Sequence, residues 1–194
     1  MTARDLPPPT LDGERSLESA IAARRTRRLF LPELLTETEV SQLLWSAQGI
    51  TDAEGGLRAA PSAMEAYPLE SYVATEKGVW RYLPVSHALE ERSREDIRAS
   101  IRAGAHDQES ITSAPVVFLF AAVYARAVAK LGPGSEPYVH MDLGHAAQNL
   151  LLQATALGLA GVPIAWLEPD RIRTAFDLPE DQVPLYLVPV GRPE

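Results

Sequence analysis

Residues 141–161, MDLGHAAQNLLLQATALGLAG, constrain the fold more than any other segment of the chain. Their pattern predicts a helix over residues 143–160 that is apolar on nearly every side. Its few polar positions are His145, Gln148, Asn149 and Gln153. A helix of this kind must be buried, either in the centre of a domain or against a partner chain. It is too short and too polar to cross a bilayer, so we expect no membrane partner.

The other segments alternate between helical and extended patterns. Helices are indicated after Ser16, after Thr36 in capping-box spacing with Glu39, and from Pro169. Residues 86–104 are polar with scattered apolar positions, which indicates one or two exposed helices, and residues 51–70 read as a long loop. Five segments read as strands: residues 71–75 and 78–83, which form a hairpin, the apolar run 114–124, and residues 162–168 and 183–191. Trp45, Trp80 and Trp166 are expected in the core.

This mixture predicts an α+β fold with helices packed around one central sheet. We expect an extended arm over residues 1–15 and a single domain over residues 16–194. The net charge of −8 argues against polymeric nucleic acid as a partner. There is no cysteine, which excludes disulfides and thiolate catalysis and fits a cytoplasmic protein.

Four arginines are concentrated in residues 22–30, AARRTRRLF. One interpretation is a solvated cluster at a helix end, where cations are favoured by about 0.3–1 kcal/mol. The other is an anion site, because guanidinium groups bind phosphate bidentately and Thr26 offers a further hydroxyl. The residues themselves leave both open.

A metal site is a weaker hypothesis. His140 and His145 would lie about 140° apart on a helix and Asp142 would point elsewhere, so capping by Asp142 is the simpler alternative. We therefore predict no metal. No Walker loop, dinucleotide glycine fingerprint or nucleophile elbow is present.

Five segments in order resemble the FMN-dependent nitroreductase family, over about residues 15–193. RRTRRLF is similar to its amino-terminal signature. LLWSAQGIT, RAAPSAMEAYPLESYVAT, GVWRYLPVSHALE and the stretch from GHAAQNLLL to VGRP resemble its SagB-type dehydrogenase branch, which includes azoline oxidases. The resemblance implies a nitroreductase-like fold, with a mostly antiparallel central sheet surrounded by helices in an intertwined homodimer.

The resemblance also implies which residues bind FMN at the interface between two subunits. Those implied to hold its phosphate and pyrimidine edge are Arg24, Arg25, Thr26, Arg28, Gln108 and Arg192. Those implied to reach the flavin of the partner are Pro61, Ser62, Ala63 and Met64, and those implied to flank its N5 atom are Pro163, Ile164 and Ala165. Arg27 matches a variable position.

The implied activity is hydride transfer from NAD(P)H through FMN to a small organic acceptor, by default a nitroaromatic or quinone. The first alternative is oxidation of azoline rings or of a carbon–carbon bond in a peptide or natural product. It is weakened because Lys130-Leu131 stands where the azoline oxidases have Lys-Tyr, leaving Lys130 the only candidate proton-transfer group. The second alternative is a flavin-binding protein without turnover, which Met64 and Glu65 would favour, since the branch usually has glycine and an apolar residue there.

Overall fold

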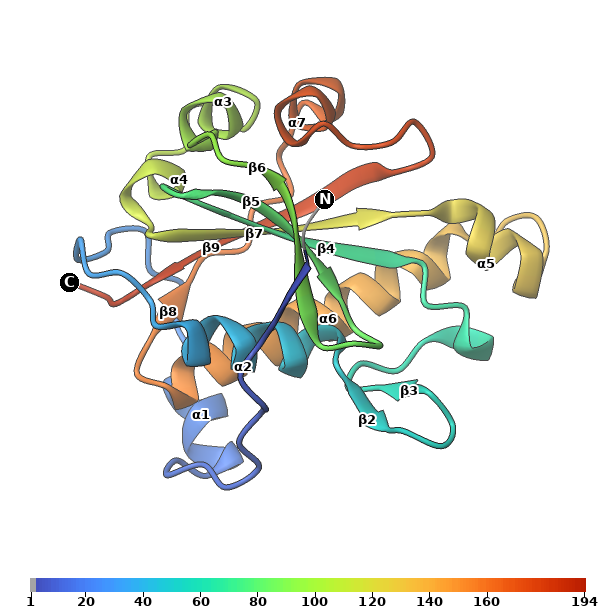
Figure 1. Ribbon diagram of the computed structural model, residues 1–194, viewed down its shortest axis with the longest axis horizontal. Helices are drawn as coiled ribbons and strands as arrows, with labels where there is room; N and C mark the ends of the chain where they lie inside the picture. Colours follow the sequence, from blue (N-terminus) through green and yellow to red (C-terminus); the bar gives the residue numbers. More distant parts are fainter. Residues whose placement is uncertain (1–2) are drawn as a thin grey trace.

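A computed structural model describes residues 3–194, so the first two residues of the expected arm lie outside the described part. One antiparallel sheet crosses the molecule in the strand order β1-β6-β5-β4-β7-β9-β8 (Figure 1). Its strands are β1 (Ala3–Asp5), β4 (Leu69–Thr75), β5 (Gly78–Leu83), β6 (Ala88–Ser93), β7 (Val116–Ala122), β8 (Ala160–Gly161) and β9 (Val183–Gly191). A separate small hairpin joins β2 (Ile50–Asp52) to β3 (Leu57–Arg58).

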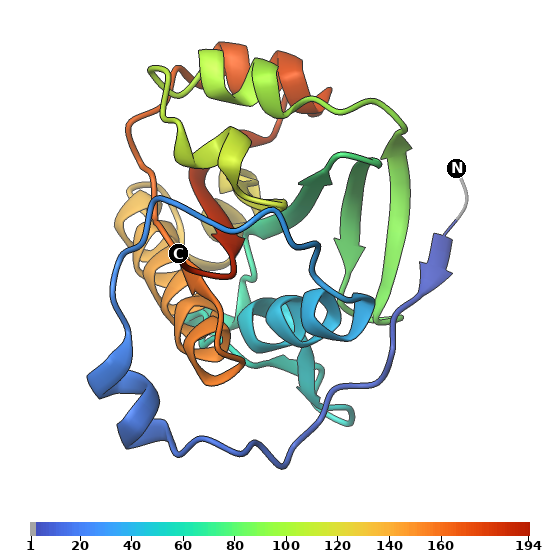
Figure 2. The ribbon, with the colours of Figure 1, turned by 90° about the vertical axis from the view of Figure 1, so that its left-hand side faces the viewer.

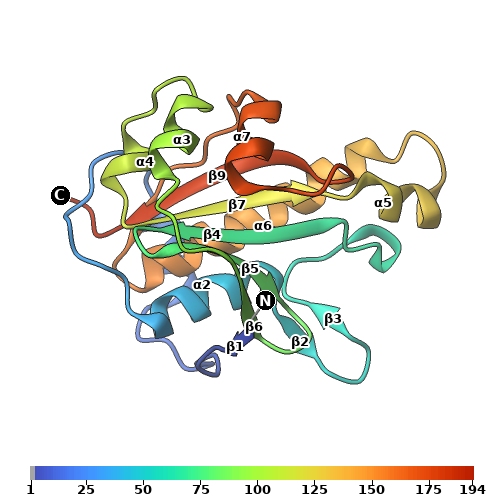
Figure 3. The same ribbon diagram turned by 45° about the horizontal axis from the view of Figure 1, so that its top comes forward.

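Helices cover both faces of the sheet (Figure 3). One layer contains α1 (Leu17–Ala23), α2 (Glu37–Gln48) and α6 (Glu136–Ala156), and the other contains α3 (Arg98–Ala103), α4 (Ser110–Ser113) and α7 (Pro169–Phe176). The short η1 (Ala63–Glu65) and α5 (Tyr124–Leu131) lie at one end of the sheet. None of the helices among residues 3–194 is long and apolar enough to cross a membrane.

The central strand β7 explains how two cores form around one sheet. Val116, Phe118 and Phe120 belong to the core on the side of α2 and α6, whereas Val117 and Leu119 belong to the core under α3 and α7. A strand with both faces buried reads as a continuous apolar run, which is what residues 114–124 show. The predicted α+β fold with a central antiparallel sheet is confirmed.

The helix starts follow their capping signals. The Ser16 hydroxyl accepts from the Ser19 amide at the start of α1, and Thr36 and Glu39 form the complete capping box of α2. Pro169 occupies the first position of α7. The arm ahead of α1 pairs through β1 with β6 and then passes around α2 (Figure 2).

Four expectations about elements are wrong in part. Residues 86–104 form the strand β6 before α3, because pairing with β1 and β5 outweighs their polar composition. Residues 162–168 continue the sheet only through one bridge, between Ile164 and Leu187. Residues 51–70 contain the β2–β3 hairpin and η1, and α6 runs from Glu136 to Ala156 rather than over residues 143–160.

Candidate functional site

The arginine segment lies beside β8, at the carboxyl end of α6. α1 ends at Ala23, so all four arginines follow it, and its last turn contains no basic residue. The Arg25 guanidinium donates to the carbonyls of Ala22 and Arg24, so Arg25 alone acts as a helix-end cation. Thr26 bridges to Gly161, and the Arg27 amide donates to the Gly161 carbonyl at 3.4 Å. Solvation of a helix end therefore accounts for one arginine of the four.

The other three arginines of the segment, Arg24, Arg27 and Arg28, have side chains without an ion pair or side-chain hydrogen bond among residues 3–194. Arg24 is half-buried, and Arg27 and Arg28 are exposed. Elsewhere arginines are paired even at the surface, as Arg94 is with Glu91 at 2.8 Å. Unpaired guanidinium groups on an acidic chain form a local cationic site for an anion.

Arg192 lies next to this segment but its charge is already neutralised. The Leu31 amide donates to its carbonyl, and Phe30 bridges to Pro193. Its guanidinium contacts the Glu33 carboxylate at 2.8 Å and that of Glu39 at 2.9 Å. A role in holding a phosphate would require Arg192 to exchange these partners.

Two further groups of expected site residues share this side of the molecule. Ile164 is fixed to β9 because its amide and carbonyl both bond to Leu187, at 2.8 and 3.0 Å. Pro163 is half-buried and Ala165 is exposed on either side of it. Gln108 lies half-buried between α3 and α4, and the Glu168 amide donates to the Gly104 carbonyl, which joins the two segments.

The segment Pro61–Met64 is not part of this group. The Ser62 hydroxyl donates to Asp142 Oδ2 at 2.5 Å, which fixes the segment near the amino-terminal third of α6. Asp142 and the last residue of α6 are about 21 Å apart at 1.5 Å of rise per residue. Within one chain, the arginines and Pro61–Met64 therefore lie toward opposite ends of α6.

Asp142 has a role that the sequence pattern did not indicate. It lies inside α6, so the expectation that it caps this helix is wrong. Burial raises the pKa of its carboxyl, opposed by hydrogen bonds from Ser62 and the Ala63 backbone and by the charge of His145. Asp142 therefore positions the 61–64 segment.

No group of three or more possible metal ligands occurs in the described chain. His140 instead contacts the Tyr124 hydroxyl at 3.0 Å.

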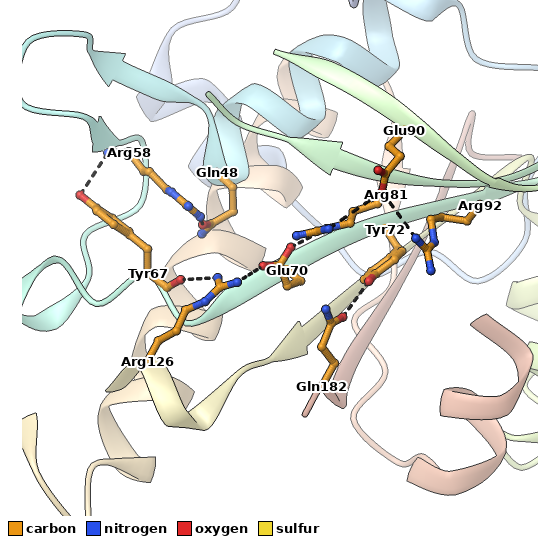
Figure 4. A network of polar contacts seen from close by, with 10 residues as sticks. All are labelled: Gln48, Arg58, Tyr67, Glu70, Tyr72, Arg81, Glu90, Arg92, Arg126 and Gln182. Atoms are coloured by element: carbon orange, nitrogen blue, oxygen red, sulfur yellow. Dashed lines mark hydrogen bonds and ion pairs between the residues drawn. The ribbon is translucent and has the colours of Figure 1, made fainter. Parts of the chain in front are cut away.

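A buried ionic network holds the next part of the chain (Figure 4). The Glu70 carboxylate lies between Arg81 Nε, at 2.9 Å, and the Arg126 guanidinium. Arg126 also donates to the Tyr67 carbonyl, and the Arg58 guanidinium lies 4.7 Å from the centre of the Tyr67 ring. Burial lowers the pKa of Arg58. These partners are far apart in sequence and match no motif, so sequence reasoning missed them.

Trp166 contradicts the expectation of a core position, whereas Trp45 and Trp80 are half-buried. Its side chain is 66% exposed and stacks on the ring of His106, with ring centres 4.0 Å apart.

Lys130 lies exposed in the last turn of α5, without an ion pair in the described chain. A cavity of about 780 Å³ lies between the arm, α1, α2 and α6, and none of the four arginines lines it.

Comparisons with known proteins agree with this architecture. The model of the nitroreductase family matches residues 21–192. The chain is 38% identical over 185 residues to a protein named "Putative nitroreductase MJ1384" from Methanocaldococcus jannaschii, covering 92% of each chain.

Two solved structures show the same fold. A crystal structure titled as a "putative nitroreductase" from Ralstonia eutropha is 29% identical, with a TM-score of 0.90, over 99% of this chain and 90% of that one. The NADPH:FMN oxidoreductase of Vibrio harveyi in complex with NAD+ is 20% identical, with a TM-score of 0.69, over 92% of this chain and 69% of that one.

Proposed function

This chain belongs to the nitroreductase family of oxidoreductases, and from that premise we propose that it is a cytoplasmic, FMN-dependent enzyme that passes a hydride from NAD(P)H to a small organic acceptor. We propose further that residues 16–194 act as one FMN-binding domain and residues 1–15 as an arm. The observation that carries the proposal is that the guanidinium groups of Arg24 and Arg28, beside β8, have no carboxylate partner among the described residues.

The residues present fit the parts of FMN. The FMN phosphate would bind to the arginine segment, where the side chains of Arg24 and Arg28 have no other partner within the described part of the chain. Arg25 would have to leave its backbone carbonyl partners to join them. The ring system needs an apolar surface, and Pro163, Ile164 and Ala165 provide one that is fixed to β9. Gln108, on the neighbouring turn, offers an amide for the pyrimidine edge.

Bound FMN would supply hydride acceptance and donation at N5. The contribution of the protein is placement and charge. The rigid 163–165 segment would hold donor and acceptor in turn against one face, which lowers the entropic cost of bringing the reactants together. The arginines would stabilise negative charge on the flavin. No side chain of the site has to transfer a proton for this step.

A homodimer completes the site in this proposal. Pro61, Ser62, Ala63 and Met64 lie toward the opposite end of α6 from the arginines, which supports their assignment to the flavin of a second subunit. α6 also leaves large apolar side chains uncovered, with Tyr138 47% and Met141 57% exposed. Exposed apolar surface of this kind marks a protein interface when it is contiguous, so we assign this face of α6 to the contact with the second subunit.

The acceptor separates the proposed activity from its alternatives. The resemblance to SagB-type dehydrogenases supports oxidation of an azoline ring or a carbon–carbon bond. Against it, Leu131 offers no hydroxyl and Lys130 is exposed on α5. Met64 and Glu65, both exposed, are the residues that would favour flavin binding without turnover.

The test has two steps. Purified protein should show a bound-flavin absorption spectrum, or acquire one after soaking in FMN and desalting. In anaerobic stopped-flow, NADH or NADPH should then bleach that spectrum within seconds, and a nitroaromatic or quinone should restore it. A protein that stays colourless contradicts FMN binding, and a flavin reduced by neither nucleotide nor a candidate substrate contradicts the enzyme.

A further inference from the structure

The side chains of His106 and Trp166 form an exposed aromatic pair that the proposed FMN site does not use. Their ring centres are 4.0 Å apart and the planes are inclined by 20°, which is a stacked arrangement. The indole is 66% exposed, and His106 is exposed as well. A large apolar side chain on the surface is unremarkable alone, but a fixed pair of rings is a preformed surface for another ring.

The backbone on both sides of the pair is fixed. Trp166 follows Ile164, which makes two hydrogen bonds to Leu187, and precedes Glu168, whose amide donates to the Gly104 carbonyl at 2.8 Å. The indole is therefore carried by a short segment held at both ends. The backbone of this segment cannot move far without breaking one of these bonds.

His106 is held in an unusual conformation. It has φ 50° and the next residue, Asp107, has φ 57°, a left-handed region that residues with a Cβ rarely adopt. The turn is closed by the amides of Ala105 and Asp107, which both donate to the Arg102 carbonyl at 3.0 Å. This conformation places the imidazole against the indole.

The pair lies between two segments that the proposed function assigns to the flavin. Trp166 directly follows Ala165, proposed to flank N5, and His106 lies two residues before Gln108, proposed for the pyrimidine edge. A molecule that takes a hydride from N5 must lie against the ring near these residues. With these assignments, the indole and imidazole would lie at the rim of the acceptor site.

We propose that Trp166, supported by His106, is a specificity-determining residue that selects flat aromatic acceptors, nitroaromatics or quinones, by stacking on their rings. This inference rests on the proposed function and narrows it. Stacking on an indole favours a planar, electron-poor ring over a small inorganic ion or a flexible aliphatic chain. The acceptor class therefore follows from the surface beside N5.

Binding without turnover gives the first test. In the absence of NAD(P)H, the affinity of the oxidised FMN-loaded protein for p-nitrobenzoate is measured by calorimetry. Trp166→Ala should weaken binding about 3- to 10-fold, the range for a lost aromatic pair. Trp166→Phe, which keeps an aromatic face, should stay within about 2-fold, and His106→Ala should fall between the two. Circular dichroism checks that each variant is folded.

Turnover gives the second test. The ratio of kcat/KM for menadione to that for ferricyanide should fall in Trp166→Ala, through a higher KM for menadione. Val85→Ala, at a residue 90% exposed in the turn between β5 and β6, is the matched control, and its ratio should match that of the wild type. An unchanged affinity for p-nitrobenzoate and an unchanged ratio would overturn the role of Trp166 while leaving FMN binding and reduction intact. A wild-type protein that takes up no FMN would overturn both proposals.

Discussion

The guanidinium groups of Arg24 and Arg27 lie three residues apart in the sequence, and we expect them to contribute differently to FMN affinity. Arg24 is half-buried at the end of α1, where the loss of one bidentate phosphate contact costs about 1.5–3 kcal/mol. Arg24→Ala should therefore raise the FMN dissociation constant about 10- to 100-fold. Arg27→Ala, exposed and at a variable position, should change it by no more than about 3-fold. Flavin fluorescence titration measures both, and equal effects would contradict the assignment of Arg24.

Met64 is a second residue whose backbone and chemistry can be tested together. It has φ 51° and is 67% exposed, and a left-handed conformation costs about 1–2 kcal/mol for a residue with a Cβ. Met64→Gly should therefore leave the melting temperature unchanged or higher and widen the pocket over the flavin. We expect kcat/KM to rise for bulky acceptors more than for small ones.

Met64→Ala is the matched control, because alanine shortens the side chain but keeps the backbone cost. Met64→Ala should raise kcat/KM for bulky acceptors without raising the melting temperature. If neither variant changes the range of acceptors, the 61–64 segment does not border the site.

Single residues differed in how much of their role could be predicted. The arginine cluster stands out in the sequence because four like charges fall within nine consecutive residues. The structure places this one segment beside Gly161. Glu70 and the His106–Trp166 pair could not be predicted. The residues of each group come together only when strands and turns far apart in the chain meet. Neither the Glu70 network nor the aromatic pair has a characteristic spacing in the sequence.

At the scale of elements, the Glu70 network joins β4, β5 and α5. The Glu70 side chain is only 7% exposed and accepts from two arginines, so its replacement leaves two cations short of a partner. Glu70→Gln should lower the free energy of unfolding by about 1.5–3 kcal/mol, measured with urea. Glu91→Gln, which breaks an exposed pair with Arg94, should cost no more than about 1 kcal/mol. Equal losses would show that the buried network stabilises the fold no more than an exposed ion pair does.

The contact between η1 and α6 predicts a dependence on pH. Burial raises the pKa of Asp142 in the folded protein, so its contribution to stability is present below the pKa of the unfolded chain and is lost as pH rises through the folded value. In urea unfolding between about pH 4 and 7, the stability of wild type relative to Asp142→Asn should fall as pH rises.

Asp96 is the control of opposite sign. A hydrogen bond from Arg98 lowers the pKa of the Asp96 carboxyl, so its contribution is present at neutral pH and is lost on acidification. Relative to Asp96→Asn, wild type should lose stability as pH falls below about 4. A difference between wild type and Asp142→Asn that does not vary with pH would contradict the burial argument for Asp142.

Elements with local signals were predicted well, and those set by distant pairing were not. The capping residues Ser16 and Thr36 fixed helix starts because their hydrogen bonds lie within three residues. β6 was read as helical because its pairing with β1 and β5 is invisible locally. Residues 162–168 contain Pro163, which has no amide to donate, and they leave the sheet after a single bridge.

At the scale of the whole molecule, the expected flavin contacts are divided between two places. The arginine segment and the 163–165 segment lie together beside β8, while Ser62 and Ala63 are held by Asp142 some 20 Å along α6. We therefore expect the two groups to contact one flavin from different subunits. The apolar helix indicates a partner from the sequence, and the structure adds that the two groups of expected contacts lie toward opposite ends of α6 within one chain.

A mixing experiment tests this division. Arg24→Ala impairs the phosphate clamp, and Ala63→Asp places a carboxylate on the segment expected to face the partner's flavin. Each homodimer should bind FMN poorly, since every site contains one defect. In a hybrid dimer, one site combines both defects and the other has neither. After equal amounts are mixed and allowed to exchange subunits, about a quarter of all sites should therefore regain wild-type affinity.

Two controls make the outcome decisive. Mass photometry or analytical ultracentrifugation should show a dimer before mixing, and tags of different size should report the fraction of hybrids. Combining both substitutions in one chain and mixing it with wild type should give hybrids in which each site has one defect, so no site is regained beyond those of the wild-type dimers. If verified hybrids of the single variants regain no FMN binding, the two segments serve the same chain or different ligands, and the shared site is contradicted.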